Sequence, residues 1–499
     1  MIRSLRPPAR PARSRVDDSL RFVVALGVLC VVGFATSGCG AGDSPEESTM
    51  SAPSRPSPPP AFYLGGIQVH EADHQLWFDN LEAQGFNAVQ VTEYAKQGDW
   101  DTDHLWWEEE SPWVVEEMRG AERNGLHVAL VLRVALDHAF ERNQFLWHGM
   151  IMPRTDEQVD SWFAQYERFV VQWAEIAERE GVDLLMIGSE MNALASTLPL
   201  DELPPLEDWY LDDDKQAERR ERLLAQRDVI EDRELWLRER ERYPTLEEYL
   251  DARIAIEQGW AQTVTGVAGS LDAPPSLEQI NARRAALDRH WRRIVEAARA
   301  VYSGRIGYAA NFDQYHEVGF WDALDVMGVN AYFKLRDRLL EDETEESLYP
   351  PLLDGWRAVL ADLDGFRAAQ DLELPVVFTE LGYTWRALST LEPWADTGFS
   401  LIEPIADPAA EVEQPASPEQ PREPLVIVWR EQPRRLWERA VAVRALHDAH
   451  AERPDPFLRG IFYWKLSSHD YHYDDESFMV HIGPDTEEPI LAELGRFVD

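Results

Sequence analysis

Short apolar runs alternate along the chain with longer segments in which apolar residues recur at helical spacing. The runs predict eight β-strands, at 63–69, 88–92, 127–134, 184–189, 305–310, 326–331, 376–380 and 460–465. Helical patterns occur at 77–84, 112–124, 155–181 and 277–302, and Gly125 and Gly181 stand where two of these helices should stop. Strands that alternate with helices predict a parallel sheet, and eight such units favour a closed (β/α)₈ barrel of the α/β class.

Two connections between a strand and the next helix are too long for a plain barrel. The first, 198–275, has a highly charged core at 213–242 with Leu223, Ile230 and Leu237 at seven-residue steps. This spacing predicts an amphipathic helix that packs on the barrel, as one arm of a helical hairpin whose second arm begins near Thr245. The second insertion, 386–433, follows the seventh strand and is rich in Pro and Glu. Both should border the active-site face, where strand-to-helix loops lie.

The first 39 residues have the pattern of a secretory signal. A basic, Pro-rich start precedes an apolar run at 22–35, which is too short for a membrane span, and small residues lead up to Cys39. The end of this pattern resembles a bacterial lipobox, with Thr36 where that motif usually has Leu, and predicts lipidation of Cys39. The alternative is an ordinary cleaved signal. Residues 40–60 should form a disordered tether to a catalytic barrel at 61–499.

Composition narrows the class of protein without naming a substrate. The 499 residues include 91 Asp and Glu against 48 Lys and Arg, which argues against a nucleic-acid partner because such a partner needs a basic face. The 19 Trp suit a sugar-binding cleft, where flat rings cover apolar sugar faces, but Trp also fills large cores. Both cysteines, Cys30 and Cys39, lie in the signal region, so no disulfide is expected after it.

A glutamate closes two of the predicted strands. The buried run 182–189 leads to Glu190, and the seventh strand ends at Glu380. Because all strands of such a barrel end on one face, the two carboxylates could work across one glycosidic bond. In a double displacement, Glu190 would protonate the leaving oxygen and later activate water, and Glu380 would attack the anomeric carbon. The alternative is that both are solvated loop glutamates.

Other strand ends carry candidates for substrate binding. Asn330 and Tyr332 share one side of the sixth strand, and Tyr332 could hydrogen-bond a nucleophilic carboxylate, unless it only lines the barrel. Trp464, at the end of the eighth strand, could lie under a sugar or could belong to the core. The full set of expected substrate-binding residues is Ser189, Asn311, Asn330, Tyr332, Trp385, Trp464, Lys96, Lys334 and Lys465.

Lysine is rare, and three of the four lysines lie at or just past predicted strand ends. These three are Lys96, Lys334 and Lys465, the fourth is Lys215, and arginine is used elsewhere. The clustering favours the hypothesis that these positions need a compact ammonium donor rather than a guanidinium group.

No metal or cofactor is expected. His469 and His472 lie with Asp470 and Asp474 in a polar loop after the eighth strand, but no third ligand is evident, and a solvated loop is favoured. The sequence shows no Gly-x-Ser-x-Gly elbow, phosphate loop or dinucleotide-binding fingerprint.

These segments together resemble clan A retaining glycoside hydrolases, and more narrowly glycoside hydrolase family 113, whose known members are β-1,4-mannanases. The resembling segments are 184–190, 320–332, 378–383 and 463–465, and the resemblance covers 61–198 and 277–499. It implies a TIM barrel with Glu190 as acid/base, Glu380 as nucleophile, Tyr332 as a support for Glu380 and Trp464 beneath the sugar. Ser189 departs from the wider clan, which commonly has Asn there for the sugar 2-hydroxyl, so the preferred sugar stays open.

The sequence therefore predicts an exported glycosidase that is lipid-anchored in the bacterial cell envelope through Cys39. It should act as a monomer on an oligo- or polysaccharide, of which β-mannan is the favoured candidate. We expect no nucleic-acid partner and no membrane contact beyond the lipid anchor. Two alternatives stay open: the same mechanism on xylan or glucan, and a non-catalytic lipoprotein whose barrel binds glycans or proteins. Sugar release from a polysaccharide panel separates the three.

Overall fold

The computed structural model describes residues 59–69, 71–201, 213–225, 227, 242–265, 276–336, 340, 343–395, 400–402, 426–428, 432–474 and 476–498. The predicted signal peptide with Cys39, and nearly all of the predicted tether, lie outside these residues. Of the helices in these ranges, none combines the length and the hydrophobicity that crossing a membrane requires.

Eight parallel strands close into a barrel. Each barrel strand pairs with the next, and β1 pairs with both β11 and β2 to complete the ring. The barrel strands are β1 (Tyr63–Gln68), β2 (Ala88–Gln97), β4 (His127–Leu136), β5 (Leu184–Ser189), β6 (Arg305–Asn311), β7 (Val326–Asn330), β8 (Val376–Leu381) and β11 (Leu458–Ser467). Short strands outside the ring are β3 (Leu105–Trp106), β12 (Val480–His481), and the pair β9 (Ser400–Ile402) and β10 (Val426–Val428). The predicted (β/α)₈ barrel is confirmed.

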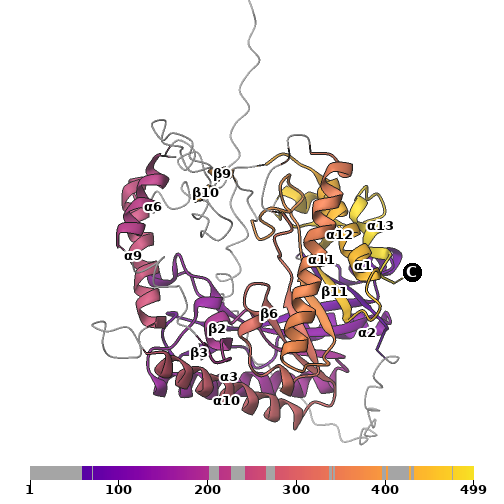
Figure 1. Ribbon diagram of the computed structural model, residues 1–499. Helices are drawn as coiled ribbons and strands as arrows, with labels where there is room; N and C mark the ends of the chain where they lie inside the picture. The colour runs from indigo at the N-terminus through magenta and orange to yellow at the C-terminus, as the bar shows by residue number, and fades with distance from the viewer. Residues whose placement is uncertain are drawn as a thin grey trace, which may run out of the picture.

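Helices surround the barrel (Figure 1). The α-helices are α1 (His74–Ala83), α2 (Pro112–Arg123), α3 (Asp156–Arg179), α4 (Asn192–Ala195), α6 (Asp213–Ala225), α9 (Leu246–Thr265), α10 (Leu277–Arg299), α11 (Glu345–Ala369), α12 (Leu436–Ala451) and α13 (Pro489–Gly495). The 3₁₀ turns are η1 (Glu141–Asn143), η2 (His148–Met150), η3 (Tyr315–Glu317), η4 (Trp321–Ala323) and η5 (Asp470–Asp474). In Figure 1, α3 lies beside α10 and α11 lies beside α12. Gly125 and Gly181 follow α2 and α3 in the left-handed conformation, with φ of 73° and 70°, as helix-ending glycines do.

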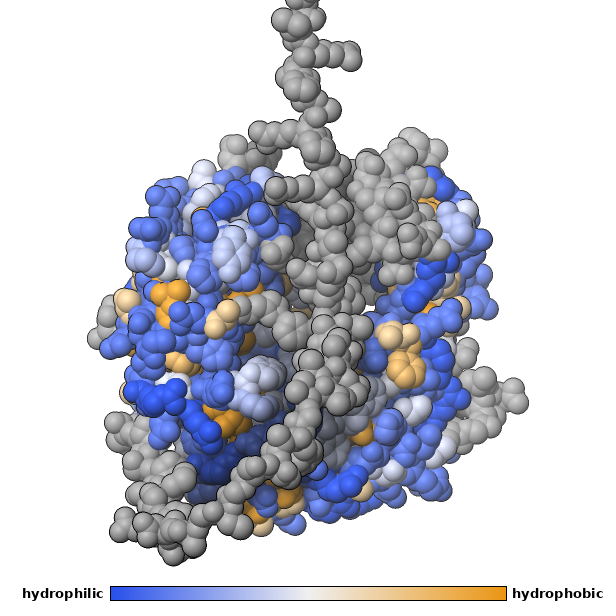
Figure 2. Space-filling view, turned by 180° about the vertical axis from the view of Figure 1, so that it is seen from behind, coloured by the Kyte–Doolittle hydropathy of each residue, from blue (hydrophilic) through white to orange (hydrophobic). Residues whose placement is uncertain are grey.

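Two apolar layers hold the barrel together. Inward-pointing residues such as Val131, Met186 and Phe462 fill its interior, and the intervening residues pack outward against the helices. Among the described residues, six tryptophans are almost completely enclosed: Trp77, Trp162, Trp173, Trp291, Trp321 and Trp356. Much of the tryptophan excess therefore serves the core. The face in Figure 2 is mainly hydrophilic, with hydrophobic residues in small separate patches.

The first insertion contains two described helices, α6 and α9, which stand together at one side of the barrel (Figure 1). Leu223 of α6 packs in a small apolar cluster with Leu246 and Leu250 of α9, whereas the other two heptad positions lie outside the described residues. Thr245 caps α9, because its hydroxyl accepts a hydrogen bond from the N–H of Glu248 and its own N–H donates to the Glu248 carboxylate. The second arm thus begins where the sequence predicts.

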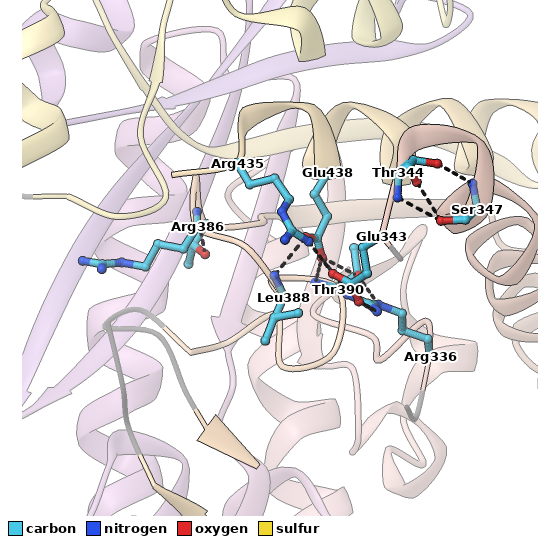
Figure 3. Close-up of polar contacts among 10 residues, drawn as sticks. Arg336, Glu343, Thr344, Ser347, Arg386, Leu388, Thr390, Arg435 and Glu438 are labelled. Carbon is cyan, nitrogen blue, oxygen red and sulfur yellow. Dashed lines mark hydrogen bonds and ion pairs between the residues drawn. The ribbon is translucent and has the colours of Figure 1, made fainter. Parts of the chain in front are cut away.

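A buried ionic network anchors the start of the second insertion (Figure 3). Glu438 of α12 is fully buried and accepts hydrogen bonds from the Arg336 guanidinium at 3.1 Å and from the Thr390 hydroxyl at 2.8 Å. Glu343 bonds both Arg336 and Arg435. Arg336 follows β7 and Thr390 follows β8, so the network joins the loops after two adjacent barrel strands.

Glu438→Gln is expected to lower the free energy of unfolding by about 3 kcal/mol. The substitution keeps the size of the side chain but removes one of the two carboxylate charges that face Arg336, whose side chain is only 3% exposed. Urea unfolding followed by circular dichroism measures the change. Glu373→Gln, at an exposed position, is the matched control and should stay within about 0.5 kcal/mol of the original chain. Equal unfolding midpoints for both variants would contradict the role of the network.

Candidate active site

The barrel brings two glutamates to its carboxyl-terminal face. Glu190 directly follows β5, and Glu380 is the last residue but one of β8. The pairing of β5 with β6 shifts register between Met186 and Ser189, and the pairing of β7 with β8 shifts just before the Asn330–Glu380 pair. Such irregularities re-aim side chains at the ends of barrel strands. Both glutamate side chains are buried, with exposed fractions of 11% and 4%.

The backbone of Glu190 adopts a conformation that residues other than glycine rarely take. Its φ is 51°, in the left-handed region, which typically costs about 1–3 kcal/mol for such a residue. Two hydrogen bonds hold it there: the Glu190 N–H donates to the Ala309 carbonyl and the Met191 N–H to the Tyr308 hydroxyl, both at 2.9 Å. Strain that the surrounding structure maintains in this way is typical of functional sites.

Arg133, near the end of β4, lies between the two carboxylates. Its Nη2 donates to Glu190 Oε2 at 3.2 Å and also to Glu380 Oε1, and its Nε donates to Ser189 Oγ at 3.1 Å. Because both carboxylate oxygens bond the same nitrogen, they lie at most two hydrogen-bond lengths apart, about 6 Å. The buried guanidinium also offsets part of the repulsion between the two acids.

Each carboxylate has one further donor of its own. The Tyr332 hydroxyl donates to Glu380 Oε2 at 2.7 Å. His148 Nε2, in η2, lies 3.0 Å from Glu190 Oε2. An ionised carboxylate can only accept hydrogen bonds, so His148 Nε2 carries the proton in this contact.

The two carboxyl groups titrate far apart. Burial raises the pKa of Glu190, but the hydrogen bond from His148 and the charge of Arg133 outweigh it and lower this pKa to about 2. Burial raises the pKa of Glu380 to about 7, with Arg133 opposing this rise and the negative charge of Glu190 adding to it. Between these two pH values the pair holds one proton and one negative charge. Two carboxyl groups that cleave an acetal need this combination of one acid and one carboxylate.

Four of the residues expected to bind substrate surround this pair. Besides Tyr332 and Ser189, Asn330 donates to Ser189 Oγ at 3.4 Å and accepts from the Thr379 hydroxyl at 2.7 Å, and these two bonds fix the orientation of its amide. Trp464 is half-buried, and its ring centroid lies 5.5 Å from the Arg133 guanidinium carbon. Each of the four thus interacts with Glu380, Arg133 or a neighbouring residue of the site.

Lys465 lies at the edge of this site. Its ammonium bonds the Glu476 carboxylate at 2.9 Å, lies 4.5 Å from the Trp464 ring centroid, and lowers the pKa of Glu380 slightly through its charge.

The other four predicted residues lie farther out. Lys334 forms an ion pair with Glu392 at 2.5 Å. The side-chain oxygen of Asn311 accepts a hydrogen bond from the N–H of the following residue, Phe312. The Trp385 indole donates to the backbone carbonyl of Glu476, after β11. Lys96 is half-buried near the end of β2. In the ranges that the structure describes, no hydrogen bond or ion pair joins any of the four to Glu190, Glu380 or Arg133, so their part in substrate binding stays a prediction.

The loop after β11 has no described metal cluster. The rings of His469 and His472 lie 6.4 Å apart. Within the described part of the chain, no three His, Cys, Asp or Glu side chains are placed to hold an ion.

Two residues of the site were not predicted from the sequence. Arg133 points to the same inner side of β4 as Ala129 and Val131, because side chains alternate along a strand. A charged residue on the inner side of a strand, near its end, could therefore have indicated Arg133 from the sequence. His148 belongs to an irregular loop, and no periodicity or spacing in the sequence relates it to Glu190.

Comparisons with known proteins agree with this fold. The family model of Glycoside Hydrolase Family 113 matches residues 70–197 and 277–404, just over half of the chain. The solved structure of the family 113 β-mannanase AaManA from Alicyclobacillus acidocaldarius, in complex with ManMIm, is similar with 15% identity and a TM-score of 0.50, covering 88% of this chain and 96% of that one. A complex structure of a family 113 β-1,4-mannanase is similar with 15% identity and a TM-score of 0.47, covering 88% and 97%. No curated protein matches the chain in sequence.

At such identities the solved structures show a shared fold and no more. The family model carries the assignment, because its two matched blocks include six of the eight barrel strands, on both sides of the first insertion. The chain therefore belongs to glycoside hydrolase family 113 and is a glycoside hydrolase.

Proposed function

We propose that the enzyme cleaves β-1,4-linked glycans with retention of anomeric configuration, with Glu190 as acid/base and Glu380 as nucleophile. The observation that carries this proposal is the single Arg133 nitrogen that bonds both carboxylates. It limits the separation of the two bonded oxygens to about 6 Å. Retaining enzymes hold their carboxyl groups about 5–5.5 Å apart, whereas inverting enzymes need about 6.5–9.5 Å to admit a water.

The reaction has two displacements at one carbon. In the first, a Glu380 oxygen bonds the anomeric carbon while the bond to the leaving oxygen breaks and Glu190 gives that oxygen its proton. In the second, Glu190 takes a proton from water, whose oxygen bonds the anomeric carbon and releases the Glu380 carboxylate. Tyr332, bonded to Glu380 Oε2, leaves Oε1 as the attacking oxygen once Arg133 gives way to the sugar.

The proton has to move within the pair before the first step. In the free site the higher pKa belongs to Glu380, whereas the proposed roles need the proton on Glu190. The two arrangements carry the same net charge and titrate as one system. Arg133 and Tyr332 both donate to Glu380, and these bonds stabilise its ionised form when Glu190 takes up the proton.

The value of kcat/KM is expected to fall as the pH rises through about 7. Above this pH the pair loses its remaining proton, and neither glutamate can then protonate the leaving oxygen. A profile on a soluble β-1,4-mannooligosaccharide from about pH 5 to 9 measures this limb. A value of kcat/KM that stays level to pH 9 would contradict the proposed pair.

β-Mannan is the proposed substrate, since the similar solved enzymes of this family are named β-mannanases. Sugar release from β-1,4-mannan, xylan and β-1,4-glucan tests it, and kcat/KM on mannan should exceed the others by at least about tenfold. Faster hydrolysis of xylan or glucan would replace mannan and leave the mechanism intact. No hydrolysis of any glycan would refute the catalytic role of the pair.

Export and lipid anchoring through Cys39 are part of the same proposal, on the sequence pattern of residues 1–39. Expression with a labelled fatty acid should label the chain, and Cys39→Ala should abolish the label. Labelling that persists in the variant would place the lipid elsewhere.

A further inference from the structure

Glu190 has one donor on a barrel strand, Arg133 of β4, and a second donor, His148, on the loop 137–155. His148 lies in the 3₁₀ turn η2 of this loop, with 27% of its side chain exposed and its ring edge-on to Trp147 at 5.0 Å. Unlike Arg133, it has no strand pairing to fix its distance from Glu190. Something else has to hold the loop against the barrel mouth.

The first insertion supplies part of this hold, beside the hydrogen bonds that join Asn143 and Met152 to the segment after β2. The indole of Trp260 in α9 is buried and donates to the Met150 carbonyl, two residues after His148, at 2.9 Å. Near the start of α9, the Tyr243 hydroxyl donates to the Gln144 side chain at 2.6 Å. The Phe145 ring meets the Tyr249 ring edge-on at 5.3 Å. Residues on both sides of His148 are thus bound to the insertion.

We infer that the helical insertion positions His148 against Glu190, so that the protonation of the acid/base residue is set by an element outside the barrel. His148, Trp260 and Tyr243 are positioning residues in this account, since they act through Glu190 and need not touch the sugar. The inference rests on the proposed function for its kinetic consequences, but the hold on the loop is a separate physical claim.

The charged surroundings of Glu190 determine the direction of the expected effect. The groups within electrostatic reach of it are Arg133 of β4, His148 of η2, Tyr308 of β6, Asp313 after β6, Tyr332 after β7 and Glu380 of β8. Removing the His148 donor withdraws stabilisation from ionised Glu190 and leaves the other groups in place. Glu190 then binds its proton more tightly, so in a larger share of the enzyme the single proton of the pair lies on Glu190, while the alkaline limb of kcat/KM, set by Glu380, stays near pH 7.

The first arm of the test is the pH profile of the full-length enzyme on its best glycan. His148→Phe, which keeps a ring but has no donor, should raise the plateau of kcat/KM by up to about tenfold and leave the alkaline limb near pH 7. His148→Gln restores an N–H donor and should return the plateau toward its original value. Trp260→Phe should raise the plateau by less, and adding it to His148→Phe should cause no further rise. Additive rises, or no rise in Trp260→Phe, would overturn the inference.

The second arm needs no catalysis. Hydrogen–deuterium exchange, followed by mass spectrometry, should become faster in peptides of the loop 137–155 in Trp260→Phe. Trp356→Phe is the matched control, because that indole is also buried and donates to a backbone carbonyl at 2.9 Å, but between α11 and α12. Unchanged exchange in the loop would overturn the hold. A chain that hydrolyses no glycan but shows the faster exchange would refute the proposed function and keep the hold.

Discussion

Glu380→Gln is expected to lower kcat/KM at least about 10⁴-fold on every substrate. The amide cannot form the ester to the anomeric carbon, so neither a natural glycan nor an activated aryl glycoside has a route to products. The side chain keeps its size, its amide oxygen can still accept from Arg133, and its NH2 group can donate to the Tyr332 hydroxyl oxygen, so the loss should not come from unfolding. Circular dichroism with the Glu373→Gln control checks this.

Glu190→Gln separates the two roles. General acid catalysis contributes about 10²–10⁴-fold, so hydrolysis of the natural glycan should fall by this factor. An aryl glycoside whose leaving group needs no proton should still form the glycosyl-enzyme, and azide should then accelerate turnover by replacing the water that Glu190 no longer activates. Equal losses on both substrates, with no effect of azide, would contradict the assignment of Glu190 as acid/base.

Arg133→Met is the second large effect, with an expected fall in kcat/KM of about 10²–10³-fold. The substitution removes the shared donor that holds both carboxylates and Ser189. Because Arg133 stabilises the ionised forms of both acids, its removal raises the pKa at which the pair loses its last proton. The remaining activity should therefore extend to higher pH, and the pH profile measures this shift.

Arg133→Lys is the comparison for this result. Lysine keeps the positive charge but has no planar fork, so it cannot bond Ser189 and both carboxylates in the same way. The alkaline limb of its kcat/KM profile should lie at nearly the same pH as in the original enzyme. Its kcat/KM should have a value between those of the original enzyme and Arg133→Met. If Arg133→Met kept both the rate and the pH profile of the original enzyme, Arg133 would not organise the pair.

The barrel could be predicted because each of its strands and helices has a recognisable pattern within its own short stretch of sequence. Each strand is a short apolar run, and residues such as Gly125 and Gly181 end helices through their own conformational freedom. The two glutamates could be found because each closes such a run, and the barrel topology then brings strand ends together across a long separation in sequence. Leu223 and Thr245 likewise indicated the two arms of the first insertion from local pattern alone.

The contacts that tune the site were not predictable in this way. The bond between Arg133 and both carboxylates depends on register shifts at strand ends, which no periodicity encodes. The place of His148 depends on the packing of Trp260 and Tyr243 against a loop about a hundred residues earlier in the chain. Such contacts arise from tertiary packing between segments that have no repeating pattern.

Proton NMR of the first sugar released from a β-1,4-mannooligosaccharide tests most directly whether two carboxyl groups act in turn on one anomeric carbon. Hydrolysis is followed before mutarotation mixes the anomers. We expect the β-anomer to appear first, because two inversions at the same carbon restore its configuration. The α-anomer appearing first would mean a single displacement by water and would contradict the covalent role of Glu380.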